Sequence, residues 1–309
     1  MAASTATTIV CIACYAYFFV LFVLYVGWLL PGLTAVVPRS IAPHVSSIED
    51  SRVNPNALTA FATDTFLVSL FALPHSFFAR DFVKEAIGLG DEWYRPLYIL
   101  LTTATLQAHM HFWQSFDASP IWDAQGTSVE PLIAGFFLFG FLFLLSATFA
   151  LDHFNLFGLS QGIGLDINKA LGLNGTENDR GMVVRLHYSL VAHPIMTGFL
   201  VISWSATVMS ASRLLFAVLM TSYIVFAVKM LEEPDLERKI GSPYTEYLAT
   251  VPSFCPFAPP SSRRRGPNKS TKIQAGCRVK TESSQMDQRF SLAAVASMIY
   301  AISKEVPQS

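Results

Sequence analysis

The chain has 309 residues, of which 52% are hydrophobic and only 14% are charged, and its formal net charge is −1. Soluble domains carry about 25% charged residues, so this composition predicts a protein that meets membrane lipid. The near-zero charge excludes nucleic-acid binding through a broad basic surface. Cys11 and Cys14 have a redox-like spacing, but they lie inside an apolar run, which favours packing.

Six apolar segments follow one another along the chain, each near the roughly 20 residues that a helix needs to cross a bilayer. Lipid offers the backbone no hydrogen bonds, so these segments are expected to be helices. We therefore predict an all-α, polytopic membrane bundle with about six transmembrane helices. The fifth segment is short and is expected to tilt or to form a hairpin with the sixth. The segments are 9–30, 57–78, 94–113, 131–151, 194–208 and 213–231.

Lysines and arginines are distributed unevenly between the connections of these segments. Placing both termini in the cytosol puts most of them on the cytosolic side, which is the arrangement that membrane proteins favour. The cytosolic set is Arg80, Lys84, Arg95, Lys169, Arg180, Arg185, Lys229, Arg238 and Lys239, and the opposite set is Arg39, Arg52 and Arg213. His75, His153, His193 and the pair Glu232-Glu233 then fall at the cytosolic boundary.

The chain changes character after the membrane domain, which we place at residues 1–257. Residues 258–289 are rich in Pro, Ser, Lys and Arg, so 258–309 is expected to be a disordered basic tail. The arginines at 263–265 could bind anionic lipid or simply be solvated. The apolar stretch 290–302 is too short to span a membrane.

Two groups of polar residues lie at the ends of the last two apolar segments. Pro194 suits the first turn of a helix, whose free N–H groups favour an anion, and His193 beside it could donate to the same ligand. Alternatively, His193 is an interfacial residue at a helix entry. Glu232 and Glu233 close the next segment, and Pro234 is expected to end its helix. Adjacent acids there oppose the helix dipole and need a cationic or hydroxyl partner, unless they are simply solvated.

The sequence Gly241-x-x-Tyr244-x-x-Tyr247 that follows predicts a short amphipathic helix. Its tyrosines could cover a bound ring or anchor the chain at the interface. We expect no metal site, because His109 and His111 have no obvious third ligand and their spacing places them on different helix faces. No obligate protein partner is evident.

Together, His193-Pro194, Gly198, Glu232-Glu233 and Gly241-x-x-Tyr244-x-x-Tyr247 resemble the membrane methyltransferases related to isoprenylcysteine carboxyl methyltransferase. Within that group the chain is most similar to the branch of methanethiol S-methyltransferases, nurim and NnrU-type proteins. The residues that carry this closer resemblance are His75-Ser76, Ala79-Arg80, Trp122, the run Asp152-His153-Phe154-Asn155-Leu156-Phe157-Gly158-Leu159 with Gln161, and the stretch from Trp204 to Ala217.

The resemblance implies an enzyme that uses S-adenosylmethionine, bound at the cytosolic side, to methylate a small thiol, with methanethiol giving dimethyl sulfide. By the same resemblance the cofactor would be held by His193, Pro194, Gly198, Glu232, Glu233 and Tyr244. His153 or His75 could accept the proton of the thiol, or else pack and cap. The alternatives are a non-catalytic nurim-like membrane protein and an NnrU-type membrane factor in nitrogen-oxide metabolism.

This chain departs from the family pattern at several positions. Ser160, Ser189 and Ala192 stand where relatives carry arginine, and Met196 replaces a tyrosine. Arginine suits bidentate binding of a carboxylate, so the loss of these arginines is expected to weaken cofactor binding. Arg180 or Arg185 in the preceding loop could supply the charge instead.

Overall fold

The computed structural model describes residues 4–30, 47–116, 118–172 and 186–260. The chain divides into two units, Met1–Arg264 and Arg265–Ser309, and the second lies outside the described residues. The expectations for the basic tail, and for Arg180 and Arg185, therefore concern residues outside this description.

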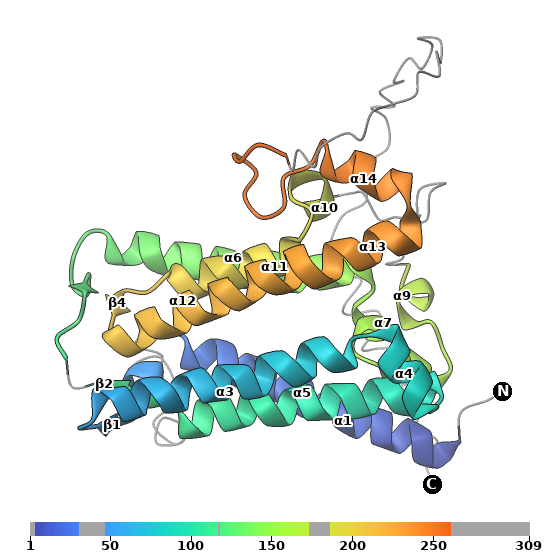
Figure 1. The fold of residues 1–309 in the computed structure, drawn as a ribbon, viewed down its shortest axis with the longest axis horizontal. Coiled ribbons are helices and arrows are strands. Elements are labelled where there is room, and N and C mark those ends of the chain that lie inside the picture. Colours follow the sequence, from blue (N-terminus) through green and yellow to red (C-terminus); the bar gives the residue numbers. More distant parts are fainter. Residues whose placement is uncertain (1–3, 31–46, 117, 173–185, 261–309) are drawn as a thin grey trace, which may run out of the picture. The chain divides into compact units, whose positions relative to one another are not determined.

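Six helical elements form a bundle within the first unit, and each overlaps one of the predicted apolar segments. Neighbouring helices alternate in direction, so the chain crosses the bundle from end to end (Figure 1). In order they are α1 (Thr5–Trp28), α3 (Ala57–Phe78), α5 (Asp91–Phe112), α6 (Glu130–Leu151), α11 (Pro194–Trp204) and a continuous helix, Ala211–Ile240, made of α12 (Ala211–Phe226), η3 (Ala227–Glu232) and α13 (Glu233–Ile240).

Four of these helices are long and apolar enough to cross a membrane: α1, α3, α6 and Ala211–Ile240. They indicate an integral membrane protein, with fewer qualifying spans among the described residues than the six expected. α5 is long enough, but its first turn carries Asp91 and Glu92 and its last turn two histidines. α11 has 11 residues and is about 16 Å long, well short of the roughly 30 Å hydrocarbon core.

Short strands depart from the all-α expectation. β1 (Arg52–Asn54) pairs in parallel with β2 (Gln114–Phe116), and β3 (Trp122–Asp123) pairs antiparallel with β4 (Val208–Met209). Strand β4 lies in the turn between α11 and α12, so these helices form the expected hairpin. The sheets lie at the end of the bundle opposite to α4 (Asp81–Ile87), α7 (His153–Leu156) and α13 (Figure 1).

Close packing of α6 against α11 fixes the position of the His-Pro segment. A Cβ atom added to Gly198 would lie only 2.8 Å from the Gly140 carbonyl oxygen and 2.7 Å from the Leu144 Cβ. Small residues let helix backbones approach in this way in membrane proteins. The structure therefore gives Gly198 a packing contact with α6, one helical turn beyond His193.

At the opposite end of the bundle, His109 belongs to an aromatic core. Its Nδ1 lies 3.0 Å from the Tyr25 hydroxyl, and its ring packs against Trp28, Trp113 and Phe216. Among the described residues, no group of three or more His, Cys, Asp or Glu side chains could hold a metal ion.

Candidate functional site

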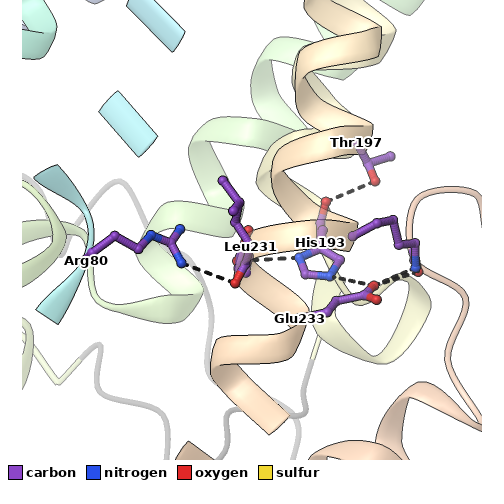
Figure 2. Close-up of polar contacts among 8 residues, drawn as sticks. Arg80, His193, Thr197, Leu231 and Glu233 are labelled. Carbon is purple, nitrogen blue, oxygen red and sulfur yellow. Dashed lines mark hydrogen bonds and ion pairs between the residues drawn. The ribbon is translucent and has the colours of Figure 1, made fainter. Parts of the chain in front are cut away.

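His193 caps the start of α11, with Pro194 in the first turn. The His193 backbone N–H donates to the Ser253 carbonyl at 3.0 Å, and Ala192 N–H donates to the Pro252 carbonyl at 2.8 Å. The Thr197 hydroxyl donates to the His193 carbonyl oxygen (Figure 2). The segment after α14 (Ser242–Leu248) thus pairs with the His-Pro segment and holds its backbone in place.

The helix that carries the acid pair does not end at Pro234. The sequence-based expectation of a helix stop there is wrong, because the helix continues to Ile240. Residues Ala227–Glu232 form a π-helical turn immediately before the proline. A π turn changes the hydrogen-bond register, so the missing proline N–H and its ring can be accommodated without ending the helix. Such turns occur frequently at functional sites.

The structure brings His193, Glu232 and Glu233 together. His193 Nδ1 lies 3.5 Å from Glu232 Oε1, and His193 Nε2 lies 3.4 Å from Glu233 Oε1 (Figure 2). Lys229 Nζ lies 2.6 Å from the same Glu233 oxygen. The side chains of His193 and Glu233 are 4% and 1% exposed, whereas Glu232 is 41% exposed. We call these four residues the acid–histidine cluster.

Two effects act on the charge of His193 in opposite directions. Burial alone would lower its pKa, but hydrogen bonding to Glu232 and Glu233 and their negative charges outweigh burial, so the His193 pKa is raised. Protonated His193 and Lys229 are the cationic partners of the acid pair, and Glu233 requires such partners because it is buried.

Two buried polar atoms at the cluster lack hydrogen-bond partners among the described residues: Glu233 Oε2 and the Tyr244 hydroxyl. Burial and the nearby acids raise the Tyr244 pKa, so its hydroxyl stays protonated and is a donor. Unsatisfied buried groups are costly, and a polar ligand would satisfy them. A carboxylate acceptor beside donors suits a ligand with an ammonium group or hydroxyls, as in an amino-acid nucleoside.

The tyrosine helix α14 packs on the His-Pro segment. Tyr244 lies in a small apolar cluster with Ala192, Leu248 and Val251. The Tyr247 hydroxyl donates to the Tyr188 carbonyl at 2.6 Å. The tyrosines therefore connect the chain before α11 to the chain after α13.

Arg80 is a site residue that the sequence-based assignment of roles left out. It follows α3, its guanidinium donates to the Leu231 carbonyl at 3.2 Å, and it forms an ion pair with Asp235 (Figure 2). This places a fixed positive charge beside the acid–histidine cluster. The family resemblance included Ala79-Arg80, but nothing in the residue spacing indicated that Arg80 would reach η3 and α13.

The three positions without the family arginines have different surroundings. Ala192 is buried, whereas Ser189 is exposed. Ser160, in α8 (Leu159–Ile163), lines a separate polar pocket of about 240 Å³ with Asp152 and Gln161.

An apolar cavity of about 420 Å³ lies inside the bundle. Both histidines predicted as proton acceptors line it. His153 is buried, with Nδ1 2.8 Å from the Thr148 hydroxyl and Nε2 2.9 Å from the Tyr15 hydroxyl. Burial lowers the His153 pKa to about 4. His75 stacks between aromatic rings. Its Nδ1 lies 2.9 Å from the Tyr98 hydroxyl and 3.3 Å from the Thr102 hydroxyl, and its Nε2 lies 3.3 Å from the Tyr98 hydroxyl.

Comparison with known proteins gives the family. The chain is 34% identical to methanethiol S-methyltransferase 2 of Bradyrhizobium diazoefficiens over 224 residues, which cover 72% of this chain and 80% of that protein. It belongs to the methanethiol S-methyltransferase family.

A second member of the methanethiol S-methyltransferase family, from Mycobacterium tuberculosis, is 32% identical over 64% of this chain and 79% of its own length. Nurim of Danio rerio is more distant, at 29% identity over 54% of this chain and 62% of nurim. No family model matches the chain, and no solved structure matches it. The family resemblance found in the sequence is confirmed.

Proposed function

We propose that this protein is an S-methyltransferase that uses S-adenosylmethionine to convert methanethiol into dimethyl sulfide. The thiol loses its proton, its sulfur forms a bond to the transferred methyl carbon, and S-adenosylhomocysteine is the second product. The cofactor, when bound, supplies a methyl group already activated by its sulfonium charge. The protein has to position the thiol in line with that methyl group, exclude water and accept a proton.

One observation carries the proposal: the acid–histidine cluster, with its unpartnered buried atoms, adjoins an apolar cavity in a member of this family. Glu232 and Glu233 would accept hydrogen bonds from the cofactor, and His193 and Tyr244 would donate them. Pro194 would orient the first turn of α11. Gly198 would act by allowing α11 to approach α6.

The apolar cavity would hold the thiol. Free thiols have a pKa near 8.5 or higher, so removal of the proton needs help from a base or from nearby positive charge. The hydroxyl near His75 Nε2 is that of Tyr98, which lies closer to Nδ1, and Nδ1 also has the Thr102 hydroxyl. His75 Nε2 is therefore the less well satisfied nitrogen, which makes His75 the better candidate base. Both nitrogens of His153 have their own partners, so we assign it a positioning role.

The site would open to the cytosol. Helices α4 and α13 and the start of α1 lie at one end of the bundle (Figure 1). Arg80 directly precedes α4, and Glu232 directly precedes α13. The lysines and arginines of the connections are concentrated at the same end, which favours a cytosolic location. Soluble S-adenosylmethionine would then enter from that side.

Titration of the purified protein with S-adenosylmethionine tests the site. His193→Ala and Glu232→Gln should each weaken binding by roughly 1–3 kcal/mol, the cost of removing a hydrogen bond to a charged group. Glu85→Gln, at an exposed position of α4, is the matched control and should leave the affinity unchanged. Equal affinities in all four proteins would contradict the assignment. Absence of binding to the native chain would favour a nurim-like, non-catalytic role.

A further inference from the structure

The cavity is much larger than the proposed substrate requires. Cavities of roughly 300–1,000 Å³ hold drug-sized ligands, and this one measures about 420 Å³. Methanethiol has only one carbon and one sulfur. A cavity of this size would leave most of its apolar wall without contact to so small a molecule, and therefore without the dispersion energy that contact provides.

The wall of the cavity is suited to an alkyl chain. It is formed mainly by aliphatic and aromatic side chains from every long helix of the bundle, among them Phe22, Phe71, Leu144, Leu145, Phe199 and Met220. Charged methionine or ribose hydroxyl groups would find few partners there. Of the polar groups on this wall, His75 is bonded to Tyr98 and His153 to Thr148, and Arg95 is a charged side chain among the lining residues.

The cavity also adjoins the acid–histidine cluster. Met196 lines it from α11, two residues after Pro194, and Val228 lines it from the π turn, four residues before Glu232. A thiol group held near Met196 and Val228 would lie beside the cluster, while its carbon chain extended between α1, α5 and α6.

We propose that the cavity binds alkanethiols with chains well beyond one carbon, so that medium-chain apolar thiols are methylated in addition to methanethiol. This inference rests on the proposed function. The reaction is the same: the S–H proton leaves, a carbon–sulfur bond forms to the transferred methyl group, and an alkyl methyl sulfide and S-adenosylhomocysteine result.

A series of straight-chain thiols from methanethiol to hexanethiol tests the proposal. Each methylene buried in the cavity should improve kcat/KM by roughly 4-fold, the factor given by about 0.8 kcal/mol per methylene, until the cavity is full. Longer thiols also concentrate in lipid or detergent, so chain length alone is not decisive. A pair of variants separates the two effects.

Leu145 and Leu142 lie on the same helix, α6, but Leu145 lines the cavity and Leu142 is exposed on the outer face. Leu145→Trp should lower the ratio of kcat/KM for hexanethiol to that for methanethiol by at least about tenfold, as loss of pocket space does in other enzymes. Leu142→Trp should leave this ratio unchanged. If both variants lower the ratio equally, or neither does, the proposal is wrong.

A binding measurement without cofactor completes the test. Methyl hexyl sulfide should raise the melting temperature of the native protein more than dimethyl sulfide does, and the difference should shrink in Leu145→Trp but not in Leu142→Trp. Methylation of methanethiol with no methylation of hexanethiol would overturn this inference and leave the proposed function standing. If no thiol is methylated, the proposed function fails. If, in addition, both sulfides raise the melting temperature equally, the assignment of the cavity to alkyl chains fails as well.

Discussion

His193 connects the two halves of the candidate site through its backbone and its side chain. Its backbone N–H is held by the segment after α14, and its ring contacts Glu232 and Glu233, where the π turn of the last long helix meets α13. The sequence could indicate these residues because ionisable groups beside apolar spans usually have a function. Lys229 could also be indicated as a partner of Glu233, because the two residues lie four apart on one helix. The contact of Arg80 with Leu231 could not be indicated, since it depends on how the helices pack.

Stability should depend on pH through His193. Its pKa in the folded protein is raised above the ordinary value of 6.5, so the stabilising contribution of its protonated form is fully present below 6.5. That contribution is lost as the pH rises through the raised value. We expect the melting temperature to fall as the pH rises above about 6.5 and through the raised pKa of His193, which thermal unfolding in detergent would measure.

The control for this pH dependence is His193→Asn, which has no titrating ring and should lose most of the slope. Glu232→Gln removes one of the two acids that raise the pKa, so the fall should end at a lower pH and be smaller. An unchanged slope in His193→Asn would show that another group is responsible.

Restoring a family arginine at position 192 should destabilise this chain. Ala192 packs against Tyr244, Leu248 and Val251, so Ala192→Arg forces a large charged group into a filled apolar cluster. Overpacking of this kind costs about 1–3 kcal/mol. Ser189→Arg is the matched control, because Ser189 is exposed, and should change the free energy of unfolding by less than about 0.5 kcal/mol. Equal stability of the two variants would contradict the packing described for α14.

At the scale of elements, two backbone features place the acid–histidine cluster. The π turn Ala227–Glu232 carries the helix through Pro234, and Gly241 then reverses the chain between α13 and α14 with φ +79° and ψ −145°. These angles lie in a region that essentially only glycine adopts. Because of this turn, α14 folds back and packs on Ala192.

Substitution of Gly241 tests the importance of this turn. Gly241→Ala should lower the free energy of unfolding by about 1–3 kcal/mol and weaken cofactor binding, because it strains the turn that holds α14 in place. Gly88→Ala is the control: Gly88 has φ +69° and ψ +16°, a left-handed conformation that other residues adopt at lower cost, and it lies away from the cluster. Thermal unfolding and cofactor titration of both variants measure the difference. Loss of cofactor binding in Gly88→Ala but not in Gly241→Ala would contradict the role assigned to the Gly241 turn.

The long helices were predictable from the sequence, whereas the π turn and the short strands were not. Long apolar runs indicated α1, α3, α5 and α6 because a helix is the simplest way to satisfy the backbone in lipid. The π turn was missed because no residue type specifies it and because Pro234 normally ends a helix. The short strands were missed because two or three paired residues leave too weak a pattern in a sequence.

At the scale of the whole molecule, the alternating helices place the cluster, Arg80 and the start of α1 at one end of the bundle. Asn174-Gly-Thr176, outside the described residues, lies in the connection expected to be cytosolic. We expect no glycan on Asn174 in a microsomal translation assay. His44→Asn creates an Asn-Val-Ser acceptor in the connection expected to face the lumen and should be glycosylated. The opposite pattern would show that the orientation is reversed.

The most direct test of the central claim is to give the purified full-length protein methanethiol and S-adenosylmethionine carrying a deuterated methyl group, and to analyse the headspace by mass spectrometry. The account predicts dimethyl sulfide with one deuterated methyl group, formed by the native chain and by Glu85→Gln, and reduced at least about tenfold in Glu232→Gln. Absence of labelled dimethyl sulfide from folded native protein, or equal formation by Glu232→Gln, would contradict the account.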